Sequence, residues 1–243
     1  MVIVTGGSTG IGRVAAQLFA REGASVAIAA RREEGKAVVE QIVADGGKAI
    51  FVRTDVSIAA DHRHLVATTV KAFGRLDLAF NNAGTEQFGK RIVDLEEDEW
   101  DRTLSINLKG VFLSMKYQIP AMIAAGGGSI VNTSSVGGVV VTPGMSAYVT
   151  SKHGVIGLTK VAALEYAKQK IRVNAICPGG THSEMFDRWI ADPQVHAEVL
   201  AIHPIGRFSH PLEQAEAALF LLSDQASFIT GIAMPVDGGR VLL

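Results

Sequence analysis

The chain of 243 residues is long enough for one large α/β domain with a sizeable core. A net charge of -1 and 23 scattered Lys and Arg residues argue against nucleic acid or an anionic membrane as a partner, so the expected partner is a small molecule. One cysteine excludes an internal disulfide and a cysteine-based zinc site, and no apolar run approaches the ~18 residues that span a bilayer. With a strand-like start, these features predict a cytoplasmic protein.

A glycine-rich turn joins the first predicted strand, Val2–Val4, to a helical pattern that runs from Arg13 to about Arg21. Glycine lets backbone N–H groups approach a ligand, and a helix N-terminus favours negative charge. The turn is therefore typical of a dinucleotide phosphate site, although a plain strand-to-helix turn is the alternative. The cofactor contacts expected here are Gly6, Ser8, Thr9, Gly10, Ile11 and Gly12.

The second predicted strand, Ser25–Ala30, ends where dinucleotide folds bind the adenosine ribose. A carboxylate at this point is typical of an NAD(H) site, whereas arginine suits the 2′-phosphate of NADP(H). The chain has Arg31 and Arg32 there, which favours NADP(H), with NAD(H) as the alternative. Either arginine could instead be a solvated charge at a helix entry.

Two further predicted strands end in residues suited to a cofactor. A helix over Glu33–Ala44 and a strand over Lys48–Arg53 lead to Asp55 and Val56. Asp55 could cap the following helix or bind the adenine amino group, with Val56 packed on the ring. A helix over 60–73 and a strand over 75–80 then lead to a turn of small residues that lets backbone approach a ligand, Asn81-Asn82-Ala83-Gly84.

The acidic run over residues 94–102 predicts the start of a helix, with a capping box between Asp94 and Glu97 and no catalytic role. The long helix behind it carries Asn107, a poor helix former inside an apolar pattern. Asn107 is either a satisfied core amide or part of a site that holds a water molecule.

The segment from Ser134 to Lys152 holds the strongest catalytic candidates. A buried strand over residues 129–134 ends at Ser135, and Tyr148 opens a helix on which Lys152 lies one turn later. An ammonium beside a phenol favours phenolate, so Lys152 should lower the pKa of Tyr148 and make it a usable acid and base. The alternative is a helix-surface pair, as we expect for Tyr166 and Lys170, which lack a strand-end serine upstream.

The last third of the chain contains one more strand that ends near the expected cofactor site, followed by a segment that could form a lid. The strand Ile171–Cys177 stops at Pro178-Gly179, and residues 180–205, with Thr181 and Ser183, form either a lid over the cofactor or a surface excursion. The expected lining of the substrate pocket is Gln87, Phe88, Val136–Met145 and His182–Trp189. A helix over 214–223 and a strand over 231–236 complete the chain. Cys177 is expected in the core, and no metal is expected because the histidines lack ligand spacing.

Strands alternate with helices throughout, which predicts a three-layer, doubly wound α/β fold with a parallel sheet. In such sheets ligands bind at the carboxyl ends of the strands. The residues singled out above follow those ends: Thr5, Ala30, Asp55, Asn81, Ser135 and Pro178.

With these motifs the whole chain resembles the short-chain dehydrogenase/reductase family. The resemblance is carried by Thr5-Gly6-x-x-x-Gly10-x-Gly12, Asp55-Val56, Asn81-Asn82-Ala83-Gly84, Asn107, Ser135, Tyr148-x-x-x-Lys152 and Pro178-Gly179. It implies one Rossmann domain over 1–243 with a seven-stranded sheet, a nicotinamide cofactor, and a homotetramer or dimer packed through long helices. It also implies a catalytic tetrad of Asn107, Ser135, Tyr148 and Lys152, with Ser183 where the family usually has Thr.

The resemblance implies hydride transfer between the cofactor and a ketone or secondary alcohol, with Tyr148 as proton donor or acceptor. Ser135 would bind the reacting oxygen, Lys152 the nicotinamide ribose, and Asn107 a water molecule. An NADP(H)-binding regulatory or scaffold protein without turnover is the alternative, and an epimerase or dehydratase on the same fold is less favoured. The sequence leaves the substrate and the direction of reaction open.

Overall fold

The computed structural model describes residues 1–243 and contains a single sheet of seven parallel strands. The strand order is β3-β2-β1-β4-β5-β6-β7, the order of a doubly wound Rossmann fold with an added seventh strand. The strands are β1 Val2–Thr5, β2 Ser25–Ala30, β3 Lys48–Arg53, β4 Leu78–Asn81, β5 Gly128–Thr133, β6 Ile171–Pro178 and β7 Ala233–Val236. The predicted seven-stranded α/β fold is thus confirmed.

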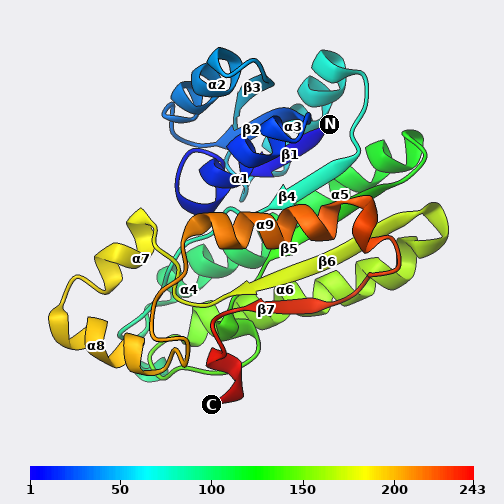
Figure 1. Ribbon diagram of the computed structural model, residues 1–243. Helices are drawn as coiled ribbons and strands as arrows, with labels where there is room; N and C mark the ends of the chain where they lie inside the picture. The colour runs from blue at the N-terminus through cyan, green and yellow to red at the C-terminus, as the bar shows by residue number, and fades with distance from the viewer.

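Helices cover both faces of the sheet (Figure 1). They are α1 Gly10–Arg21, α2 Gly35–Ala44, α3 Ala59–Phe73, α4 Glu97–Leu104, α5 Gly110–Ala124, α6 Ser146–Tyr166, α7 Glu184–Trp189, α8 Pro193–Ala201 and α9 Pro211–Leu222. One apolar cluster packs α1, α2 and α9 on one face, and a second packs α3, α5 and α6 on the other. Helices α7 and α8 stand apart from these layers. None of the helices combines the length and apolar character of a membrane span.

Strand β1 pairs with β2 on one side and with β4 on the other. The order in which strands are added to the sheet therefore reverses at β1. The crossovers from β1 to β2 and from β4 to β5 therefore leave in opposite directions and open a crevice at the carboxyl ends of these strands. The buried strands are rich in Val, Ile and Ala because both sheet faces are covered by helices. This crevice is where the candidate site lies.

Three predicted details are wrong. Helix α1 begins at Gly10 rather than Arg13, so the glycines form its first turn. No capping box joins Asp94 to Glu97, because Asp94 lies in a separate short turn and bonds to Arg91, and Glu96 precedes α4. Helix α6 ends at Tyr166, and Lys170 follows it in a left-handed conformation (φ 60°), so these two residues do not form a pair along one helix face.

Candidate active site

The glycine-rich turn after β1 is packed so closely that it has no room for side chains at two of its glycines. We call this turn the glycine cradle. The Thr5 hydroxyl accepts hydrogen bonds from the backbone N–H groups of Asn82 (3.0 Å) and Ala83 (3.1 Å), which ties the turn to the end of β4. Gly6 has φ +68°, and a Cβ there would lie 3.0 Å from the Cα of Ala83. A Cβ on Gly12 would overlap the carbonyl oxygen of Gly6. Only glycine fits at both positions, and backbone N–H groups border the space in front of the N-terminus of α1.

The catalytic candidates Ser135 and Tyr148 face one another from two elements. Ser135 follows β5 and accepts a hydrogen bond from the Gly137 N–H (3.0 Å), and Tyr148 lies in the first turn of α6. A Cβ on Gly137 would be 3.3 Å from Cε1 of Tyr148 and 3.5 Å from Oγ of Ser135. The strand end and the helix start thus place a hydroxyl and a phenol beside each other, as the sequence predicts.

Lys152 lies one helical turn beyond Tyr148 and is buried. Its ammonium donates a hydrogen bond to the Thr133 carbonyl (3.0 Å) and lies 5.5 Å from the centre of the Tyr148 ring. Burial lowers the pKa of Lys152 to about 8, because an ammonium loses solvation in the interior. Lys152 therefore reaches the cleft as a cation at neutral pH, and burying this charge costs the folded state free energy.

The predicted lowering of the Tyr148 pKa is wrong in direction. Burial raises the pKa of this phenol above its ordinary value, and a hydrogen bond with Ser135 offsets only part of the effect. The negative charge of Glu86 raises the pKa further. The sequence pattern gives the spacing of Tyr148 and Lys152 but not the depth at which they lie. A raised pKa favours the protonated phenol, which suits Tyr148 to act as a general acid.

Asn107 lies in a widened, π-helical turn, Ser105–Lys109, between α4 and α5. Its side-chain oxygen accepts from the Thr85 N–H (2.8 Å), and its NH₂ group donates to the Thr85 carbonyl (2.9 Å) and to Ser151 (3.2 Å). The amide is fully buried and already used on both sides. Of the two interpretations, the satisfied core amide describes this side chain. The predicted water site stays a prediction.

The predicted adenosine contacts lie at the ends of β2 and β3. Asp55 accepts hydrogen bonds from the Ser57 N–H (2.9 Å) and hydroxyl (2.7 Å), and these bonds hold its pKa below the usual value although burial raises it. The predicted capping of the following helix by Asp55 is wrong, because α3 begins after Ile58 without a side-chain cap and Asp55 instead closes a turn with Ser57. The predicted contact with adenine stays a prediction. Arg31 and Arg32 are exposed, and Arg32 lies 3.9 Å from Glu184 of α7.

The segment predicted as a lid contains α7 and α8 and borders the same cleft. Ser183 caps α7 by accepting from the Phe186 N–H (3.1 Å), and its Cβ is 3.2 Å from where a Cβ on Gly10 would lie. The hydroxyls of Thr181 and Ser209 share a hydrogen bond of 2.7 Å. The lid segment therefore meets the glycine turn directly.

The cleft unites most of the predicted site residues. Among those that line it are Gly6, Thr9, Gly10, Ile11, Asn82, Ala83, Gly84, Ser135, Tyr148, Lys152, Pro178, Gly179, Thr181 and Ser183. Ser8, Gly12, Arg31, Arg32, Asp55, Val56 and Asn107 lie outside its lining. Phe88 and Met145 line the substrate side as predicted, but Gln87 does not, because its side chain turns into the protein.

Two serines that hold the backbone of the catalytic candidates were not predicted from the sequence. Ser134 donates to the carbonyl of Lys152 (2.9 Å), and Ser151 donates to the carbonyl of Tyr148 (2.6 Å). A serine inside a helix, one position before a catalytic candidate, was the available signal for Ser151. Cys177 is buried as predicted, and burial raises its thiol pKa to about 11. No group of three or more His, Cys, Asp or Glu side chains is placed to hold a metal ion.

The sequence matches a family model and the sequences of several known proteins. A family model described as enoyl-(acyl carrier protein) reductase matches residues 6–240. The 2,5-dichloro-2,5-cyclohexadiene-1,4-diol dehydrogenase of Sphingobium indicum is 49% identical over 98% of this chain and 95% of the relative. The cyclohexanol dehydrogenase of an Acinetobacter species is 44% identical over 98% of this chain and 93% of the relative.

The fold is also similar to those of solved structures. A short-chain type dehydrogenase/reductase from Mycobacterium marinum superposes with a TM-score of 0.93 at 34% identity, covering 98% of this chain and 94% of that chain.

Proposed function

Because the chain belongs to the short-chain dehydrogenase/reductase family, we propose that it interconverts a ketone and a secondary alcohol with NAD(P)(H), using Tyr148 as the general acid and base. The observation that supports this most directly is that Ser135, Tyr148 and Lys152 line the same cleft as the glycine cradle. The relatives named above act on hydroxyl groups, as their names state. A binding module has no need of a buried lysine beside a buried phenol.

The cradle fits a dinucleotide, because Gly6 and Gly12 leave only backbone in front of the N-terminus of α1. When bound, the nicotinamide supplies or accepts the hydride at the substrate carbon. In reduction, Tyr148 donates its phenolic proton to the oxygen of the carbonyl, on which negative charge develops, and Ser135 stabilises that charge with a hydrogen bond. In oxidation, the Tyr148 phenolate takes the proton of the alcohol. Lys152, which donates to the Thr133 carbonyl, would hold the cofactor ribose through its ammonium.

We propose NADP(H) as the preferred cofactor. Arg31 and Arg32 follow β2, where the adenosine ribose binds in this fold, and no carboxylate occupies the strand end. Both guanidinium groups are exposed and free to turn toward a 2′-phosphate, and the ion pair of Arg32 with Glu184 is long at 3.9 Å. We treat residues 1–243 as one cofactor-binding domain whose lid spans about 180–205.

We propose a cyclic, uncharged secondary alcohol or ketone as the substrate class. The names of both relatives describe six-membered carbocyclic alcohols. In this chain the substrate side of the cleft is bordered by Phe88, Met145 and Trp189, with the rings of Phe88 and Trp189 5.7 Å apart. Glu86 also lines it, and its carboxylate is paired with Arg188 at 3.3 Å.

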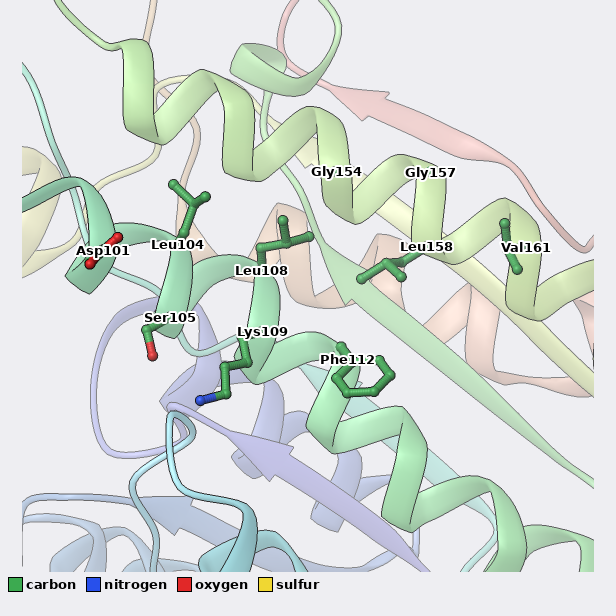
Figure 2. Close-up of a pocket in the computed structure, with 10 residues that line it drawn as sticks. All are labelled: Asp101, Leu104, Ser105, Leu108, Lys109, Phe112, Gly154, Gly157, Leu158 and Val161. Atoms are coloured by element: carbon green, nitrogen blue, oxygen red, sulfur yellow. The ribbon is translucent and has the colours of Figure 1, made fainter. Parts of the chain in front are cut away.

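We further propose a homotetramer, in which one interface covers the outer face of α5 and α6. Figure 2 shows Leu104, Leu108 and Phe112 on one side of a groove and Leu158 and Val161 of α6 on the other. The groove continues along the same two helices past Phe112, and nothing in the monomer covers it. Such an apolar face is typical of a two-fold interface.

We also propose a cytoplasmic location, where the thiol of Cys177 would stay reduced.

The proposed function is tested by following the near-ultraviolet absorbance of NADPH and NADH with cyclohexanone, an open-chain ketone, a sugar and a 3-oxoacyl thioester. We expect turnover with cyclohexanone, a higher kcat/KM with NADPH than with NADH, and oxidation of cyclohexanol in the reverse direction. Tyr148→Phe should lower kcat about 10³-fold at an unchanged cofactor Kd. Cofactor binding without turnover on any substrate would favour the scaffold alternative, and equal use of NADH would refute the cofactor preference.

A further inference from the structure

Gln87 is a buried polar residue beside the site for which the proposed mechanism has no use. It belongs to the loop that follows β4, and its side chain is 2% exposed. Its NH₂ group donates to the Gly144 carbonyl (3.1 Å), and its oxygen accepts from the Ala147 N–H at 3.1 Å and lies 3.5 Å from the Tyr148 nitrogen. The amide therefore joins two loops that are about sixty residues apart in the chain.

Helix α6 lacks a cap of its own. The first N–H groups of any helix have no acceptor within the helix and usually receive one from the N-cap side chain. In α6 that position is held by Met145, which has no suitable oxygen. Gln87 supplies the missing acceptor from outside the helix, at the turn that carries Tyr148.

The same contact fixes the preceding loop. Besides Gln87, the Lys90 N–H donates to the Gly144 carbonyl (3.3 Å), so both loops are held together at this carbonyl. Gly144 has φ +80°, a conformation that favours glycine. Loss of the Gln87 amide would leave the Gly144 carbonyl held by Lys90 alone and the first turn of α6 without its acceptor. A small movement of that turn would displace the Tyr148 hydroxyl from Ser135.

We propose that Gln87 is a positioning residue that caps α6 from a remote loop and holds the Tyr148 hydroxyl beside Ser135, where both groups can reach the reacting oxygen of the substrate. This inference rests on the proposed role of Tyr148. The cap acts only through the backbone of Ala147 and Tyr148, since Gln87 does not line the cleft.

The test compares Gln87→Met with Gln118→Met. Gln118 is similarly buried but bonds to Asn81 at the end of β4, so its variant loses a buried amide that has no contact with the first turn of α6. We expect Gln87→Met to lower kcat about ten- to a hundredfold while the KM and the Kd of NADPH change little. Gln87→Glu keeps the acceptor for Ala147 but loses the donor to Gly144, so it should recover only part of the lost kcat. Amide hydrogen exchange at Ala147 should become faster in Gln87→Met but not in Gln118→Met.

A kcat loss no larger than that of Gln118→Met, or unchanged exchange at Ala147, would overturn the inference. If Gln87→Met fails to fold, Gln87→Asn keeps the amide but shortens its reach, and the same kcat loss and faster exchange are expected. Wild-type protein that binds NADPH but shows no turnover would refute the proposed function alone, because the exchange measurement still tests the cap.

Discussion

Lys152 illustrates at the scale of one residue how a site can reduce the stability of its fold. The side chain is 4% exposed, and burial brings its pKa from 10.5 to about 8. Below pH 8 both the folded and the unfolded chain hold the proton, so the folded state bears the full cost of the buried charge. Between pH 8 and 10.5 only the unfolded chain stays protonated, and stability therefore rises with pH.

We predict that Lys152→Met abolishes turnover but raises the free energy of unfolding at pH 7 by about 1–3 kcal/mol, since the pKa shift corresponds to about 3 kcal/mol and the hydrogen bond to Thr133 is lost. The advantage over wild type should shrink as the pH approaches 10. Urea denaturation at both pH values measures this. Lys160→Met, at an exposed position on the same helix, is the control and should show no such pH-dependent gain. A destabilised Lys152→Met protein at pH 7 would contradict the prediction.

The residues of the site were predictable to different degrees. Ser135, Tyr148 and Lys152 follow from the end of a strand, the start of a helix and a four-residue spacing, all of which are local. The pKa of Tyr148 was not predictable, because it depends on burial beneath segments distant in sequence. Gln87 was expected in the pocket because it follows a strand end, yet its contacts lie in the opposite direction.

At the scale of the element, the π-helical turn around Asn107 joins the helix α4–α5 to the loop after β4. A widened turn exposes backbone groups that an α-helix would pair, and it rotates Asn107 toward Thr85. The sequence singles out Asn107 but predicts an uninterrupted helix, because the apolar pattern continues through the turn. The amino-acid composition of Ser105–Lys109 does not indicate that this turn is π-helical rather than α-helical.

We predict that Asn107→Ala lowers both the free energy of unfolding, by about 2–4 kcal/mol, and kcat, because the N–H and carbonyl of Thr85 lose their partner. The matched control is Asn174→Ala. Asn174 is also fully buried, and its amide likewise bridges a backbone N–H and carbonyl, those of Ile232 and Ile229. Asn174→Ala should cost similar stability at little cost in kcat. Equal kcat losses in the two variants, measured on fully folded protein, would remove the special role of the π-helical turn.

At the scale of the whole molecule, the layered fold follows from the alternation of strands and helices. Right-handed crossovers place successive helices on the faces of a parallel sheet, and the carboxyl ends of the strands then meet at one edge. The contents of the lid were not predictable, because α7 and α8 are short and their side chains pack on one another rather than on the sheet. The ion pair between Arg32 and Glu184 likewise joins elements that only the folded chain brings together.

The outer face of α5 and α6 allows a prediction about assembly (Figure 2). Val161 on α6 and Val43 on α2 are similarly exposed in the monomer, at 52% and 54%, so a charge at either should change monomer stability little. Only Val161 borders the apolar groove. We therefore predict that Val161→Glu shifts the protein toward smaller species in sedimentation equilibrium, because two copies of the charge would be buried at a two-fold interface, whereas Val43→Glu keeps the wild-type mass. An unchanged mass for Val161→Glu would place the interface on another face.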